Sequence, residues 1–380
     1  MPVFLSMLGI FIILAVVWDG FETMVLPRRV TRRARFARFF YHSTWRAWSL
    51  FLRIIPSGKR REAFRAFFGP VSLLLLLFIW AACLIAGFSI LYMVPEAGLH
   101  TDQGRPGFWL GIYMSGTTFF TLGLGDVVPV GGIARALTVL EAGMGFGFLA
   151  VLISHLPSLH QSFSHREVNI SLLDARAGSP PTAYEILHRH TRNEGMEALR
   201  LMLNDWERWS AELLENHLSF PVLAYYRSQH DNQSWLAALT AVLDVCTLII
   251  ASLEGACEHQ AQLTFAMARH AVVDLAFVFK TNPRAPKNDR LSEKELFDLR
   301  TSLAKENLHL RTGAEADERI TELRRMYEPY VYALSRYLHI ELPPWISETG
   351  RSDNWQTSAW DQVRRTKKGE GPLGIGRGHF

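Results

Sequence analysis

The sequence predicts an all-α membrane protein, and three observations support this fold class. Its 380 residues are 49% hydrophobic and 20% charged, and the mean hydropathy of +0.07 lies between the values typical of soluble and of fully membrane-embedded chains. Three apolar runs have the length of a membrane crossing. The basic residues cluster in one stretch between two of these runs. A chain that is part membrane-embedded and part soluble explains all three observations.

The first apolar run, Pro2–Trp18, contains no charged residue and extends to Leu26 only through Asp19 and Glu22. It lacks a positively charged region before it and a small-residue cleavage site, so we expect residues 1–26 to form a retained transmembrane helix rather than a signal peptide. The two acids fall near the inner end of this helix. There we expect them to be solvated at the interface or paired with nearby arginines.

Two further runs are predicted to cross the membrane. Val71–Val94 has 24 residues without a charge, and Ala136–Leu156 has 21 residues with one acid, Glu141. About 20 residues are enough to cross the hydrocarbon core. The sequence leaves open whether Glu141 faces an aqueous cavity or is tied to a neighbouring helix.

Residues 27–69 form a basic segment, with twelve Lys or Arg, a single acid and a net charge of +11. Basic loops stay on the cytoplasmic side, which predicts an outer amino terminus and a cytoplasmic carboxy-terminal domain in a multi-pass protein of the cell membrane. Aromatic residues alternate with the arginines, so we expect this segment to lie in the interface on anionic lipid, and not on nucleic acid. The predicted lipid-facing residues are Arg28, Arg29, Arg32, Arg33, Arg35 and Arg38.

Between the second and third runs, residues 107–120 can form a helix that is too short to span, and a glycine-rich stretch follows at residues 121–126. A helix and loop that enter and leave the membrane on one side are tolerated only where they are buried in protein or line water. This arrangement indicates a pore or a transporter site.

The glycine-rich stretch carries the pattern Thr-x-x-Thr-x-Gly-x-Gly-Asp, from Thr118 to Asp126, between two apolar helices. In this it resembles the potassium-channel pore family, over roughly residues 70–156. The resemblance implies a potassium-channel-like pore module, placed after an extra amino-terminal span and before a cytoplasmic α-helical domain. Its parts are an outer helix at 71–94, a pore helix at 107–120, a filter at 121–126 and an inner helix at 132–156.

The resemblance also assigns roles to single residues. Stacked rings of backbone carbonyls replace the water shell of potassium, and the filter residues are Thr121, Leu122, Gly123, Leu124 and Gly125. The residues expected to support the filter are Thr118, Asp126, Tyr113 and Met114. A gating hinge is expected at Gly145, although close helix packing is an equally good role for this glycine. The residues expected to line the cavity are Phe146, Ala150 and Ile153.

The sequence departs from the commonest family pattern at two positions. Leu124 replaces the usual filter aromatic, and Met114 replaces a pore-helix aromatic that often holds that ring. The glutamate that some members carry in the pore helix is here Thr117. Potassium selectivity is the leading interpretation, and a weakly selective monovalent cation channel is the alternative.

One filter motif per chain supplies a quarter of a pore, so we expect a homotetramer in which each chain has three identical partners. No nucleophile, phosphate-binding loop or cofactor motif stands out, which predicts a protein that is not an enzyme and needs no cofactor, with K⁺ as the transported ion. A membrane-anchored helical sensor or scaffold with a vestigial pore is the interpretation from a different class.

Residues 157–348 are predicted to form a cytoplasmic helical domain for an unknown regulatory ligand or protein. Patterns typical of helix capping begin at Thr182 and Ser292. The apolar pair 236–253 and 261–279 contains charged residues in mid-run, so we expect a buried hairpin rather than a membrane hairpin. The polar, Gly-rich residues 349–380 are predicted to be disordered. The stimulus that gates the pore is not predicted.

Overall fold

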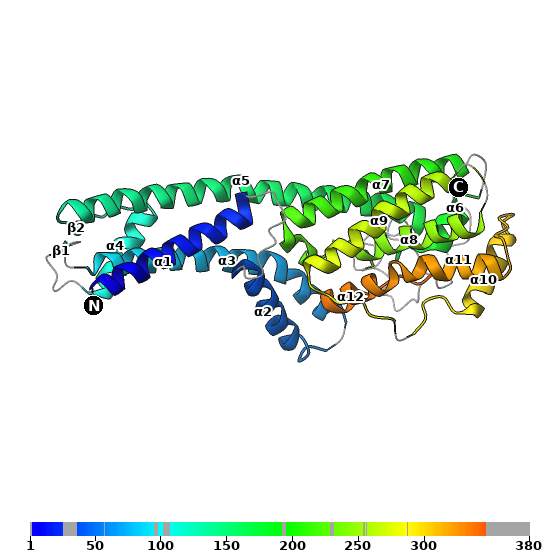
Figure 1. Cartoon of the computed structure of the whole chain (residues 1–380), viewed down its shortest axis with the longest axis horizontal. Coiled ribbons are helices and arrows are strands. Elements are labelled where there is room, and N and C mark those ends of the chain that lie inside the picture. The colour runs from blue at the N-terminus through cyan, green and yellow to red at the C-terminus, as the bar shows by residue number, and fades with distance from the viewer. Residues whose placement is uncertain are drawn as a thin grey trace, which may run out of the picture. The chain divides into compact units, whose positions relative to one another are not determined.

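The computed structural model describes residues 2–25, 36–56, 58–94, 98–101, 107–191, 195–228, 232–253, 255, 257–286 and 288–346. These residues are almost entirely α-helical (Figure 1), which confirms the predicted all-α membrane class. The chain divides into two compact units, Met1–Gln161 and Ser162–Phe380. The predicted tail at 349–380 and the arginines at 28, 29, 32, 33 and 35 lie outside the described residues.

The first unit contains the three predicted spans and the short elements between them. Its elements are α1 (Pro2–Gly20), a π-helical turn (Phe21–Val25), α2 (Phe36–Phe51), α3 (Lys59–Tyr92), β1 (Leu99–Thr101), α4 (Phe108–Phe119), β2 (Val127–Pro129) and α5 (Gly132–Ala177). Helix α5 continues through Pro157 into the second unit, past position 156 where the sequence predicted its end. One proline removes a single backbone hydrogen bond, and the helix resumes beyond it.

Helices α1 and α3 approach closely at a pair of glycines. A Cβ on Gly87 would lie 2.7 Å from a side-chain carbon of Ile13, and one on Gly9 would lie 2.9 Å from the Gly87 carbonyl oxygen. Glycines at such a crossing let two backbones pack together where no hydrophobic effect drives helices to associate. The amino-terminal span is therefore packed directly against α3.

Asp19, at the carboxyl-terminal end of α1, is buried and connects three helices. Its carboxylate accepts hydrogen bonds from the Trp80 indole of α3 at 3.1 Å and from the Ala37 backbone amide at 3.3 Å, in the first turn of α2. A carboxylate is stabilised at a helix amino terminus by the free backbone amides there. Glu22 accepts a hydrogen bond from Trp18 at 2.9 Å. The sequence predicted solvation or arginine pairing for both acids and did not foresee these indole partners.

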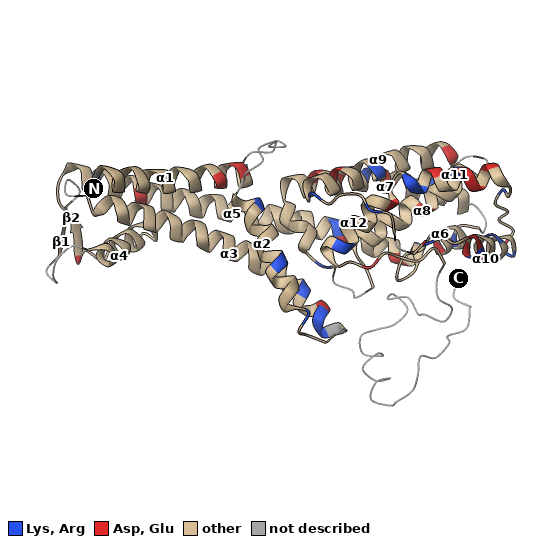
Figure 2. Ribbon diagram, turned by 60° about the horizontal axis from the view of Figure 1, so that its bottom comes forward, with Lys and Arg blue, Asp and Glu red and all other residues tan. Residues whose placement is uncertain are grey.

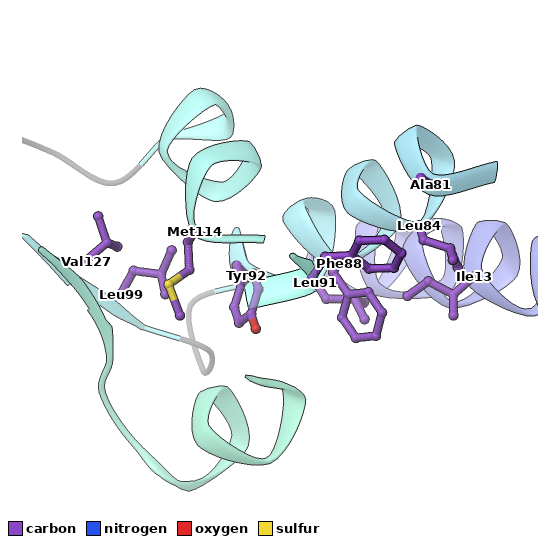
Figure 3. Packing of buried hydrophobic residues seen from close by; sticks show 10 residues of the cluster. Ile13, Ala81, Leu84, Phe88, Leu91, Tyr92, Leu99, Met114 and Val127 are labelled. Carbon is purple, nitrogen blue, oxygen red and sulfur yellow. The ribbon is translucent and has the colours of Figure 1, made fainter. Parts of the chain in front are cut away.

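A small apolar core joins the elements that surround α4. Figure 3 shows Leu99, Met114 and Val127 gathered between α4 and the strand pair, with Phe88 and Leu91 of α3 toward α1. The strands β1 and β2 are antiparallel, with Leu99 paired to Pro129 and Thr101 to Val127. This core fixes the segment that follows residues 121–126.

The second unit is a helical bundle. Its elements after α5 are α6 (Ala183–Arg189), α7 (Gly195–Ser219), a 3₁₀ turn (Pro221–Tyr225), α8 (Trp235–Ser252), α9 (Glu258–Val278), α10 (Glu293–Ala304), α11 (Ala314–Arg325) and α12 (Glu328–Leu338). Thr182 caps α6, and Ser292 forms the complete capping box that the sequence predicted. Helix α6 ends at Arg189 and α7 begins at Gly195, where a Cβ would lie 2.3 Å from the His190 carbonyl oxygen.

Among the described residues, helix α8 is one of four helices that are long and apolar enough to cross a membrane, yet 94% of its apolar window is buried inside the protein. Its central acid, Asp244, is fully buried and is bonded by Arg290 at 2.5 Å and by the Tyr327 hydroxyl at 2.5 Å. Figure 2 shows charged residues spread over this unit and almost absent from α1 and α3 beyond their ends. Burial by protein thus explains the apolar sequence of α8.

Candidate functional site

Helix α4, at the predicted pore helix, is held against α3 by serines. A Cβ on Gly111 would lie 2.6 Å from the Ser89 hydroxyl oxygen, and that hydroxyl donates to the Phe108 carbonyl at 3.1 Å. One turn further, the Ser115 hydroxyl lies 2.9 Å from the Ile85 carbonyl oxygen. The sequence gives α4 small residues on one face, which lets its backbone approach α3 this closely.

The chain turns sharply where α4 ends. The Thr117 carbonyl accepts hydrogen bonds from the amides of Leu122 at 2.7 Å and Gly123 at 3.4 Å. The residues that follow have positive φ at every second position, with 57° at Thr121, 57° at Gly123 and 82° at Gly125. Alternation between left-handed and ordinary backbone angles allows successive carbonyls to face one side, as a row of ion ligands requires.

Thr121 is the member of this alternation that sequence reasoning missed. Glycine adopts positive φ readily, whereas a β-branched residue at φ 57° is an outlier. Residues held in such sparsely populated angles gather at functional sites. The same segment is open to its surroundings in the single chain, with Leu122 63% and Leu124 62% exposed.

The predicted supporting residues lie around this segment. The Tyr113 hydroxyl donates to the Asp126 carboxylate at 2.8 Å, which joins α4 to the end of the filter segment. Thr118 is buried. Met114 is packed in the core with Leu99 and Val127, whereas Leu124 is 62% exposed.

Helix α5 contacts the end of α4 at Gly145, because a Cβ there would overlap the Phe119 carbonyl oxygen. The rings of Phe119 and Phe148 lie 5.8 Å apart at the same contact. Close packing, one of the two roles considered for Gly145, is therefore visible in the structure, and the hinge role stays a prediction. The predicted cavity-lining residues Phe146, Ala150 and Ile153 are all exposed on α5.

Glu141 is tied to neighbouring helices, which is one of the two alternatives that the sequence left open. Its side chain is completely buried, bonded to the Ser115 hydroxyl of α4 and to the Tyr92 hydroxyl of α3 at 2.9 Å. It does not line a solvent-exposed cavity of this chain. Of the predicted lipid-facing arginines, Arg38 lies on α2 and has interactions of its own.

Comparison with known proteins agrees with this geometry. Residues 74–159, which contain most of α3, all of α4 and the first half of α5, match the model of a family described as "Ion channel". An uncharacterised membrane protein of Bacillus subtilis, YdjJ, is 31% identical over 182 residues, which is 46% of this chain and 51% of that protein. Protein LctB of Geobacillus stearothermophilus is 33% identical over 85 residues, which is 20% of this chain and 63% of LctB.

The chain spans between half and two thirds of the length of these curated relatives. No solved structure matches. The described fold places the short helix α4 and the glycine-rich residues 121–126 between the long apolar helices α3 and α5. Residues 74–159 are therefore similar to an ion channel family, in agreement with the resemblance that the sequence motif indicated.

Proposed function

We propose that the protein is a potassium-selective channel that conducts K⁺ passively through a homotetrameric pore. The observation that carries the proposal is the backbone of residues 121–125, where positive φ angles alternate directly after the carboxyl end of α4. Potassium must exchange its water shell for protein oxygens at little net cost, and stacked carbonyl rings provide those oxygens.

The proposed ligands are the carbonyls of Thr121, Leu122, Gly123 and Leu124, with the Thr121 hydroxyl at the innermost site. The carboxyl end of α4 carries partial negative charge, so a cation beside it is stabilised. Gly125 and Asp126 would then end the filter at its outer mouth, where Tyr113 holds the carboxylate in place.

The exposure of the filter supports assembly into a tetramer. Leu122 and Leu124 are more than half exposed in one chain, and only 11% of the apolar window of α5 is buried. Irregular backbone at membrane depth must be buried in protein or line water. Four copies around an axis would satisfy both conditions, because each would cover its neighbours and leave the carbonyls facing a shared pore.

The basic segment suggests the orientation in the membrane. The side chains of Phe39 and Ile54 are 70% and 80% exposed beside the arginines of residues 27–69. Exposed apolar side chains flanked by arginines suit an interface with anionic headgroups. We place this segment and the second unit on the cytoplasmic side of the cell membrane and the amino terminus outside.

Flux from liposomes tests the proposal. Liposomes with the purified full-length chain are expected to release K⁺ much faster than Na⁺. The Gly123→Asp variant should lose this flux, because it places a charged side chain at a left-handed position inside the filter. Variant and wild type should elute as the same oligomer.

The two alternatives give different results in the same experiment. Equal release of K⁺ and Na⁺, abolished by Gly123→Asp, identifies a weakly selective monovalent cation channel. Absence of flux from correctly assembled protein would favour the other alternative, a membrane-anchored scaffold or sensor with a vestigial pore.

A further inference from the structure

The buried Glu141 joins the three helices of the pore module behind the filter. Besides Ser115 and Tyr92, the network includes Thr138 of α5, whose hydroxyl lies 3.0 Å from the Tyr92 hydroxyl and also donates to the Ala134 carbonyl at 2.9 Å. Ser115 is in turn 2.9 Å from the Ile85 carbonyl. One carboxyl group thus connects α3, α4 and α5.

The hydrogens available at Ser115 favour the protonated form of the carboxyl. The 3.0 Å contact between the Tyr92 and Thr138 hydroxyls has no hydrogen of its own, because these hydroxyls donate to Glu141 and to the Ala134 carbonyl. The Ser115 hydroxyl faces two oxygens, one of Glu141 and the Ile85 carbonyl, but has one hydrogen to donate. A protonated Glu141 removes the conflict, since its own O–H donates to the Ser115 oxygen and leaves the serine hydrogen for Ile85. The other carboxyl oxygen still accepts from Tyr92. An ionised Glu141 would leave one of the two contacts without a hydrogen.

The surroundings of Glu141 are also neutral. Helix α4 contains no charged residue, and α3 contains none from Val71 to Tyr92. On α5 the nearest ionisable side chains along the sequence are Arg135 and His155. No ion pair to Glu141 is found among the described residues, and Tyr92 is the one titratable group that contacts it. Burying a charged carboxylate without a cationic partner is strongly unfavourable.

The network reaches the filter through α4. Ser115 lies two residues before Thr117, whose carbonyl holds the amides of Leu122 and Gly123. The hydroxyl of Thr117 is itself used within α4, on the Met114 carbonyl at 2.9 Å. Behind α4, the carboxyl group of Glu141 comes from α5, while that of Asp126 lies at the end of the proposed filter.

We propose that Glu141 is a positioning residue that works as a neutral, protonated acid and fixes α4, and with it the filter, against α3 and α5. This inference rests on the proposed ion conduction. Because the acid acts as a donor on one oxygen and an acceptor on the other, glutamine can replace it: the amide N–H₂ would donate to Ser115 and the amide oxygen would accept from Tyr92.

Three variants measured by K⁺ and Na⁺ flux in liposomes test this role. Glu141→Gln should keep the K⁺/Na⁺ ratio of the wild type, whereas Glu141→Ala should lower it by about tenfold, since buried hydroxyls lose their partner. Ser115→Ala removes the hydrogen bond between Ser115 and Glu141 by deleting the hydroxyl on α4, and it leaves the Glu141 carboxyl in place. It should lower the ratio in the same direction, and it replaces Glu141→Ala if that variant does not assemble.

A pH profile gives a readout that a merely structural role would not change. As the pH rises, the wild type should lose selectivity when Glu141 loses its proton, and Glu141→Gln should keep its selectivity over the same range. The inference is overturned if Glu141→Gln behaves like Glu141→Ala, which would mean that the ionised form is needed, or if the alanine variants keep wild-type selectivity. Absence of flux from the wild type would instead contradict the proposed conduction.

Discussion

The hydroxyl of Tyr113, in the middle of α4, donates a 2.8 Å hydrogen bond to the carboxylate of Asp126, which ends the proposed filter segment. This bond ties Asp126 back to α4. The chain between Tyr113 and Asp126 contains every proposed carbonyl ligand. A hydrogen bond to a charged group is stronger than one between neutral groups. It is therefore a direct restraint on the shape of the filter.

Removing this bond should loosen the filter and leave the fold intact. Tyr113→Phe is expected to raise the relative permeability of Na⁺ by about three- to tenfold, the range that corresponds to the loss of one net hydrogen bond. Single-channel recordings in mixed K⁺ and Na⁺ measure this change. Tyr330→Phe, in the second unit, is a matched control. Unchanged selectivity in Tyr113→Phe would show that Asp126 braces the filter through other contacts.

A substitution at Gly145 distinguishes a packing role of this glycine from a hinge role. Gly145→Ala would place a methyl group on the Phe119 carbonyl, and such overpacking is expected to cost about 1–3 kcal/mol. The melting temperature of the detergent-solubilised protein should fall accordingly. Gly147→Ala is the control, because a Cβ at Gly147 meets no atom within 4 Å. A Gly145→Ala protein that melts like the wild type but gates differently would favour the hinge role.

The Asp244–Arg290 pair tests the assignment of α8 to the core of the second unit. Asp244→Leu alone should destabilise this unit by about 3–5 kcal/mol, because Arg290 loses its 2.5 Å carboxylate partner and, among the described carboxylates, keeps only the 3.4 Å contact with Glu328. The double variant Asp244→Leu/Arg290→Met should recover part of that loss, and a double-mutant cycle from denaturant melts measures the coupling. If α8 instead faced lipid, Asp244→Leu alone would stabilise the protein.

His217 should make the second unit sensitive to acid. Burial lowers the pKa of His217 to about 3, with a smaller contribution from the Arg166 charge, whereas the unfolded chain has its ordinary pKa near 6.5. Between these values the unfolded state binds the extra proton, so stability falls as the pH falls below about 6.5, by about 2 kcal/mol at pH 5.

His217→Phe keeps a ring beside Trp235, 4.9 Å from the histidine ring in the wild type. It should lose this part of the pH dependence in thermal melts between pH 7 and 5. An identical slope in wild type and variant would show that His217 is not protonated on unfolding in this range.

The features that could be predicted from the sequence are those with a local signal. Apolar length marked α1, α3 and α5, and Thr182 and Ser292 marked two helix starts. The predicted filter pattern could be recognised because its threonines and glycines lie within nine consecutive residues, Thr118 to Asp126. The mid-run charge of Asp244 indicated a buried hairpin, and the Arg290 and Tyr327 contacts give the physical reason.

The features that could not be predicted depend on contacts between distant residues. The partners of Glu141 lie 26 and 49 positions away, so spacing along α5 alone could not decide between a cavity and a neighbouring helix. The bond between Asp19 and Trp80 joins residues 61 positions apart. The left-handed backbone angle of Thr121 is imposed by the turn after α4. A threonine in the sequence gives no sign of such an angle.

The reversal potential of the purified wild-type protein in a planar bilayer, with K⁺ on one side and Na⁺ on the other, tests the central claim most directly. A filter built from the carbonyls of residues 121–124 predicts a reversal potential strongly displaced toward that of K⁺, with a current that Gly123→Asp abolishes. A reversal potential near zero, with a current that still depends on Gly123, would contradict potassium selectivity.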